Sequence, residues 1–286
     1  MNHRIAGFTC CSNALPPSME LRVRKVGEVL ACHGIETRYG PNMFSDCPWG
    51  HGSARERARQ LMDFFWDPAV TEIYDLSGGD LANGILPYLD YDVIRANPKP
   101  FSGYSDLTTV LNAIYAKTGL ETILWQARNL IDDSTGAQLT RFGTDQMTQL
   151  WPYFIRGKDM EGTLVGGNIR CFLKLAGTEY FPDLTGKILL LEARGGEVPQ
   201  MMTYLAQLEQ LGAFRKVRGI LLGTFTAMER SNEGPSIQDL VLSLVPENLP
   251  VAVTAEIGHG TDSKAARIGG YYRFPGNNMK NQKDFL

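Results

Sequence analysis

The chain has 286 residues, of which 43% are hydrophobic and 21% are charged, and its formal net charge at pH 7 is −3. This slight negative charge excludes the basic footprint of nucleic-acid-binding proteins, so we expect no nucleic acid partner. No apolar run approaches the roughly 18 residues of a membrane span, and the first residues lack a hydrophobic signal core. We therefore expect a cytoplasmic protein with no membrane partner.

Cysteine and histidine content narrows the chemistry further. The five cysteines are odd in number and show no CxxC spacing, which favours reduced thiols over disulfides or a zinc site. A histidine-dependent mechanism has only four candidates, which are His3, His33, His51 and His259.

The first third of the chain alternates short apolar strands with amphipathic helices. A strand over residues 5–10 precedes a helix over residues 18–33. Ser53 and Glu56 form a capping box that begins a second helix, which ends before Pro68. This alternation predicts a mostly parallel, doubly wound sheet, whose ligand-binding loops gather at the carboxyl ends of the strands.

Two polar loops follow the next strands and are expected to converge there. The strand over residues 70–76 runs into the glycine-containing loop 77–83, and a short strand leads into Gly103–Leu107. Helical spacing downstream of Leu107 places Ser105 at a turn that opens a helix, where unpaired N–H groups face charge that develops on a substrate oxygen. Ser105 therefore suits an acyl-transfer nucleophile, although a serine at such a turn is also a common N-cap.

The second half is predicted to be a compact mixed β domain. Residues 132–161 are polar and irregular and are interpreted as the crossing between domains. Three apolar strands follow at 187–192, 218–223 and 250–254, and Pro199 begins a helix between the first two.

Glu192 and His259 stand at the ends of apolar strands, as Ser105 does. Glu192 closes an aliphatic run, where a carboxylate needs a partner, and flanking glycines let the backbone hold His259 toward a cleft. A serine hydrolase needs a base for its hydroxyl proton and an acid that orients this base. The alternatives are an ion pair of Glu192 with Arg194 or another cation at a strand end, and an ordinary Gly-His-Gly turn at His259.

These residues belong to an ordered set of motifs that resembles the LD-carboxypeptidases of serine peptidase family S66, which includes the microcin C self-immunity proteins. The resemblance runs through nearly the whole chain. It rests on the Gly-Gly loop and on the segments 86–92, 97–108, 166–168, 177–192 and 258–259.

The resemblance implies a Ser-Glu-His triad of Ser105, Glu192 and His259 and an oxyanion hole from the backbone N–H groups of Gly79 and Asp106. It also implies a Rossmann-like domain over 1–131, a linker over 132–161 and a β-rich domain over 162–286. A homodimer without cofactor or metal is implied as well. It leaves the residues that bind the substrate unknown.

Three segments depart from the family pattern. Residues 77–83 are closer to the microcin-immunity branch, and the stretch 156–163 is short where relatives have an insertion over the site. Leu124–Arg128 stands where relatives show a Gly-Pro turn, and its Trp125 is either core packing or a platform for a flat substrate group.

Three functions are consistent with the sequence. The first is a carboxypeptidase that cuts the L,D-peptide bond of murein peptides. The second is the same chemistry turned on a peptidyl or aminoacyl nucleotide antibiotic. The third is a binding protein that kept the fold and lost the activity.

Overall fold

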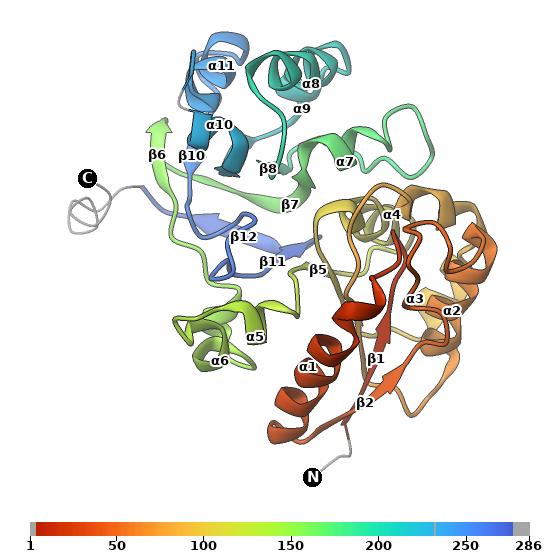
Figure 1. Ribbon diagram of the computed structural model, residues 1–286. Coiled ribbons are helices and arrows are strands. Elements are labelled where there is room, and N and C mark those ends of the chain that lie inside the picture. The colour runs from red at the N-terminus through yellow and green to blue at the C-terminus, as the bar shows by residue number, and fades with distance from the viewer. Residues whose placement is uncertain (1–3, 232, 277–286) are drawn as a thin grey trace.

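The computed structural model describes residues 4–231 and 233–276, which form two six-stranded sheets surrounded by helices (Figure 1). The strand orders are β11-β5-β4-β3-β1-β2 and β12-β7-β8-β9-β10-β6. Both sheets are mixed, and the first is dominated by parallel pairs, so the predicted two-domain α/β fold is confirmed. Within the described ranges, no helix is both long and apolar enough to cross a bilayer.

The first sheet has the doubly wound order 2-1-3-4-5 in its parallel part. In such sheets the strand order reverses between the first and third strands, and ligands bind at the carboxyl ends there. The loops after β1 and β3 therefore lie at the expected binding edge. The six strands are β1 (Arg4–Thr9), β2 (Ile35–Tyr39), β3 (Glu72–Asp75), β4 (Phe101–Gly103), β5 (Thr122–Leu124) and the antiparallel β11 (Ala266–Ile268).

Helices cover both faces of this sheet. The predicted capping box is present at the start of the second helix, because Ser53 and Glu56 exchange both of their hydrogen bonds. The helices are α1 (Glu20–Cys32), α2 (Ala54–Trp66), α3 (Tyr91–Ala96) and α4 (Thr108–Thr118), with the short 3-10 helices η1 (Pro17–Met19), η2 (Ala82–Tyr88) and η3 (Ser105–Leu107).

The second sheet has four parallel strands between two antiparallel edges. Its helices α8 to α11 gather at the side away from the first sheet (Figure 1). The strands are β6 (Tyr153–Arg156), β7 (Met160–Asn168), β8 (Ile188–Ala193), β9 (Gly219–Phe225), β10 (Val251–Val253) and β12 (Tyr271–Phe274). The helices are α7 (Ile169–Leu173), α8 (Val198–Gln210), α9 (Ala213–Lys216), α10 (Thr226–Ser231) and α11 (Ile237–Leu244).

Two segments join the halves more closely than the sequence predicts. Residues 132–161, expected as an irregular crossing, contain α6 (Ala137–Arg141), η4 (Asp145–Met147) and β6, which pairs with β10. They are preceded by α5 (Asn129–Asp132). From the C-terminal half, β11 returns to pair with β5 of the first sheet. Such pairings between distant segments leave no local pattern in the sequence.

The glycine-rich end of β7 docks the second sheet onto α4. The side-chain amide of Asn112 donates to the carbonyl of Gly166 and accepts from its N–H, each at 2.9 Å. The N–H of Asn168 donates to the hydroxyl of Thr108 at 3.1 Å. Gly166 has a φ of 106°, and a Cβ there would lie 2.2 Å from the carbonyl oxygen of Leu190, so only glycine fits. This docking brings the ends of β4, β7 and β8 together.

Candidate active site

Ser105 is the first residue of η3 and occupies the strained turn that follows β4. Its φ is 58°, and no other non-glycine residue in the described part of the chain has a positive φ. The left-handed conformation costs an L-residue about 1–2 kcal/mol, and such strain is concentrated at functional sites. The N-cap of η3 is Tyr104 rather than Ser105, so the alternative in which Ser105 is only a capping residue is not supported.

Asp106, the next residue, joins three segments of the chain through its buried carboxylate. Oδ2 accepts hydrogen bonds from the Ser12 hydroxyl at 2.6 Å and from the Ala82 N–H at 2.8 Å. Oδ1 pairs with Nζ of Lys174 at 2.5 Å. Since Lys174 follows α7, the serine turn is attached to both halves of the protein.

A second buried carboxylate, Asp75, shapes the loop after β3. It accepts hydrogen bonds from the Cys11 N–H at 2.6 Å and from the N–H and hydroxyl of Ser77 at 2.8 and 2.5 Å. Burial raises the pKa of Asp75, and these hydrogen bonds oppose the shift. The carboxylate therefore holds the loops after β1 and β3 in a fixed relation.

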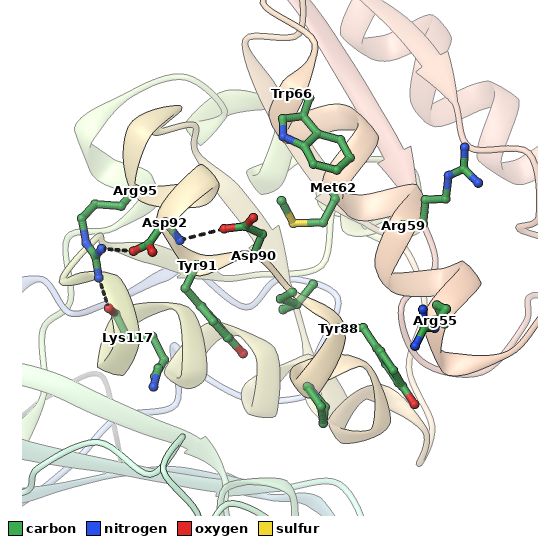
Figure 2. Close-up of a pocket in the computed structure, with 12 residues that line it drawn as sticks. Arg55, Arg59, Met62, Trp66, Tyr88, Asp90, Tyr91, Asp92, Arg95 and Lys117 are labelled. Carbon is green, nitrogen blue, oxygen red and sulfur yellow. Dashed lines mark hydrogen bonds and ion pairs between the residues drawn. The ribbon is translucent and has the colours of Figure 1, made fainter.

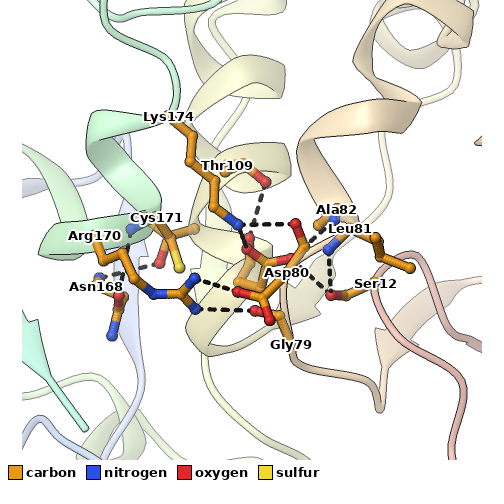
Figure 3. A network of polar contacts seen from close by, with 12 residues as sticks. Ser12, Gly79, Asp80, Leu81, Ala82, Thr109, Asn168, Arg170, Cys171 and Lys174 are labelled. Atoms are coloured by element: carbon orange, nitrogen blue, oxygen red, sulfur yellow. Dashed lines mark hydrogen bonds and ion pairs between the residues drawn. The ribbon is translucent and has the colours of Figure 1, made fainter. Parts of the chain in front are cut away.

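The backbone around Gly79 is fixed on both sides. Asn13 donates its N–H to the Gly78 carbonyl at 3.2 Å and accepts from the Asp80 N–H at 3.0 Å. Arg170 donates to the Gly79 carbonyl at 3.0 Å and also pairs with Asp80 (Figure 3). A trans peptide directs its C=O and N–H to opposite sides. The Gly79 N–H therefore points away from Asn13.

Glu192 and His259, which are 67 residues apart in the chain, are brought into contact. Oε2 of Glu192 lies 2.8 Å from Nδ1 of His259, and the carboxylate is fully buried. Glu192 thus pairs with the imidazole and not with Arg194. The ring of Tyr104 lies edge-on to the imidazole at 5.0 Å, and burial, followed by the charge of Glu192, raises the pKa of this tyrosine well above its usual range.

Ser105 and His259 line one cavity of about 1050 Å³ between the two halves. Within the described ranges, Nε2 of His259 has no hydrogen-bond partner, so no bond joins it to Ser105 in this structure. Gly79 and Asn168 line the same cavity, whereas Asp106 is fully buried and does not line it. Four arginines also line it, which are Arg128, Arg170, Arg194 and Arg230.

Another cavity, of about 830 Å³, lies on the N-terminal half beside α2 and α3 and contains none of the predicted site residues (Figure 2). Three of its cations are already engaged, and one of them, Lys117, pairs with Glu179 at 2.6 Å. The guanidinium of Arg55 lies 5.1 Å from the ring centre of Tyr88, and Arg95 pairs with Asp92 at 2.5 Å.

Trp125 is a core residue. It is 3% exposed, its indole N–H donates to Gln138 at 3.1 Å, and it packs against Tyr74 and Phe142. It does not line the large cavity, so a stacking platform for substrate is not supported.

Sequence reasoning missed the cations that α7 contributes. Arg170 and Lys174 are four residues apart and both reach the loop that contains Asp80 (Figure 3). Lys174 also reaches Asp106 in the turn after β4. Their helical spacing after the Gly-Gly-Asn motif was the available signal. Their partners were hidden because they lie 68 and more residues away in the chain. In the described part of the chain, no cluster of three His, Cys, Asp or Glu side chains is arranged to hold a metal ion.

These features define a two-domain α/β protein with a polar cavity between its domains. Models of the LD-carboxypeptidase N-terminal domain and C-terminal domain match residues 6–124 and 161–274. The chain therefore belongs to the LD-carboxypeptidase family, peptidase family S66, as the sequence motifs indicated.

Known relatives include both a microcin self-immunity protein and a murein peptide carboxypeptidase. The chain is 30% identical over 210 residues to the microcin C7 self-immunity protein MccF of Escherichia coli, covering 60% of this chain and 61% of that protein. It is 25% identical over 270 residues to the murein tetrapeptide carboxypeptidase of Pseudomonas aeruginosa, covering 88% and 87%. A solved structure of MccF in complex with aspartyl sulfamoyl adenosine has the same fold, with a TM-score of 0.83, 23% identity and coverage of 95% and 92%.

Proposed function

We propose that the protein is a serine carboxypeptidase in which Ser105 attacks an amide carbonyl near the free carboxylate end of its substrate. One observation carries the proposal. The fully buried Glu192 is bonded to His259, and His259 lines the same cavity as the strained Ser105. A nucleophile, a base and a group that orients the base are the three parts of this chemistry.

The contact with Glu192 assigns the roles of the two imidazole nitrogens. A carboxylate accepts hydrogen bonds, so Nδ1 of His259 carries the proton and Nε2 presents a lone pair. Nε2 takes the hydroxyl proton of Ser105 as the serine attacks and returns it to the leaving amine. Water then hydrolyses the acyl-enzyme by the same route. Glu192 stabilises the imidazolium while it exists.

The N–H groups of Gly79 and Asp106 stabilise the oxyanion that forms on the attacked carbonyl. Support comes from the fixed Gly78–Gly79 peptide, whose carbonyl is held by Asn13, and from the position of Asp106 in the first turn of η3. N–H groups of a first helical turn have no intrahelical acceptor. Fixed donors of this kind usually supply the largest single contribution to acyl-transfer catalysis.

A murein peptide with an L,D-bond is the first candidate substrate. It is supported by a relative with 25% identity over 88% of this chain, which is named murein tetrapeptide carboxypeptidase. A peptidyl or aminoacyl nucleotide antibiotic is the second. It is favoured by the 30% identity to MccF and by that protein's solved complex with aspartyl sulfamoyl adenosine. Incubation with a murein tetrapeptide and with an aminoacyl sulfamoyl adenosine shows which is consumed.

Replacement of the nucleophile tests the proposal. Ser105→Ala should abolish turnover of the consumed substrate and should prevent labelling by a fluorophosphonate, while the thermal unfolding midpoint stays close to that of the wild type. Turnover at the wild-type rate in the variant contradicts the serine mechanism. A wild type that neither labels nor turns over either substrate favours the third function, a binding protein on this fold.

A further inference from the structure

Arg128 lines the large cavity and has a buried N–H group without a partner among the described residues. It is the N-cap of α5 in the segment that follows β5, and it lines the cavity at the carboxyl edge of the first sheet. Its Nε is buried and, among the described residues, has no hydrogen-bond partner. Burial also lowers the pKa of Arg128.

The nearby carboxylates are committed to other groups. Asp132 pairs with Arg22 on α1, and Asp75 accepts from Cys11 and Ser77. Among the described residues, Arg128 makes no ion pair of its own. The cavity's Arg170, by contrast, is bound to Asp80 and to the Gly79 carbonyl.

A buried guanidinium N–H without an acceptor is destabilising, because it has lost water and gained no partner. If Arg128 only filled space, a methionine or leucine would do so without this cost. A bound ligand that supplies an acceptor to the buried N–H of Arg128 would remove this cost. A guanidinium presents its donors as a planar fork, which matches the paired oxygens of a carboxylate or a phosphate.

We propose that Arg128 forms a subsite for a second anionic group of the substrate, a carboxylate or phosphate that is not part of the bond being cleaved. The subsite lies on the N-terminal side of the cavity, where Gln126 and Asn129 add amide groups and Leu15 adds an apolar wall. This inference rests on the proposed function, since it describes the substrate of that same cavity. A carboxylate would come from a peptide substrate, and a phosphate from a nucleotide.

The test measures binding and not turnover. Ser105→Ala protein, with and without Arg128→Met, is titrated calorimetrically with a murein tetrapeptide and with the same peptide amidated at each carboxylate in turn. Adenosine 5′-monophosphate and adenosine form the nucleotide pair. We expect Arg128→Met to weaken binding of one charged ligand roughly 10- to 100-fold, with no effect on the form in which the recognised group is neutral. The ligand pair that responds identifies the source of the anion.

Two results overturn the subsite: equal affinities with and without Arg128→Met, or equal losses for charged and neutralised ligands. Arg59→Met is the matched control, because Arg59 is exposed and lies in the other cavity. If Arg128→Met does not fold, the amidation series and the nucleotide pair are measured on protein that retains Arg128, because unchanged affinity throughout both comparisons rules the subsite out. Failure of the serine mechanism is seen separately, as turnover by Ser105→Ala protein.

Discussion

Nζ of Lys174 lies 2.5 Å from Oδ1 of Asp106, and this ion pair attaches the C-terminal half to the residue that follows Ser105. The Asp106 side chain is fully buried and the Lys174 side chain is 19% exposed. The same ammonium donates to the Asp80 carbonyl at 3.0 Å. The contact that attaches the two halves to each other therefore also holds the turn that carries Ser105.

Removal of this cation should destabilise the protein and disturb the site together. Lys174→Met leaves the buried Asp106 charge without its ion pair, for which we expect a loss of about 2–4 kcal/mol in the free energy of unfolding. Urea denaturation measures it, and fluorophosphonate labelling of Ser105 should slow in parallel. Lys117→Met is the control, because its pair with Glu179 is exposed and should contribute less than about 1 kcal/mol. Equal effects of the two substitutions would contradict the role of Lys174.

Glu192→Gln tests the orientation of the imidazole. The amide keeps the size of the carboxylate but can donate to Nδ1, which favours the wrong tautomer of His259, and it cannot stabilise the imidazolium. By analogy with the aspartate of serine proteases, kcat should fall by roughly 10²- to 10⁴-fold. Thermal unfolding checks that the fold is intact. Glu161→Gln, at an exposed pair with Arg273, should leave kcat unchanged.

Arg170→Lys tests whether the contacts of Arg170 with Gly79 and Asp80 hold the Gly79 N–H in place for the oxyanion. Lysine keeps a positive charge near Asp80 but cannot hold both Asp80 and the Gly79 carbonyl in the same fork geometry. We expect kcat to fall roughly 10-fold with little change in KM, because an oxyanion donor acts in the transition state. A change confined to KM would instead indicate that Arg170 binds the ground-state substrate.

The strain at Ser105 predicts an order of stability among variants. Glycine has no Cβ and adopts the left-handed conformation of this position without a steric cost. Alanine has a Cβ and therefore retains this cost. Ser105→Gly should therefore be about 1 kcal/mol more stable than Ser105→Ala, although both lack the nucleophile. Urea denaturation of the two variants, which differ by one methyl group, measures the difference directly. Equal or reversed stabilities would show that the turn is not strained.

His51 gives a prediction for the pH dependence of stability. Its imidazole is buried, and burial followed by the charge of Arg57 lowers its pKa below the ordinary 6.5. The unfolded chain therefore takes up a proton at a higher pH than the folded one. The stability due to neutral His51 is present above pH 6.5 and is lost as the pH falls toward the folded pKa. Urea denaturation between pH 7 and about pH 5 should show a smaller loss for His51→Gln than for the wild type.

Local features of the chain were predictable from sequence. The capping box at Ser53 and Glu56, the turn at Ser105 and the helix after it depend on neighbouring residues and appear where they were expected. The parallel character of the first sheet was also predictable, because strands that alternate with helices form right-handed crossovers. Family membership followed from the ordered motifs.

Long-range pairings were not predictable. The return of β11 to the first sheet, the partners of Arg170 and Lys174, and the isolation of Arg128 depend on residues far apart in the chain. By itself, the sequence determined the local backbone, through side-chain sterics, capping and periodicity, and the set of polar residues available for chemistry. Only the tertiary structure decided which of these residues meet. Burial and ion pairing depend on packing between segments, and the number of residues between two segments does not tell how far apart they lie in space.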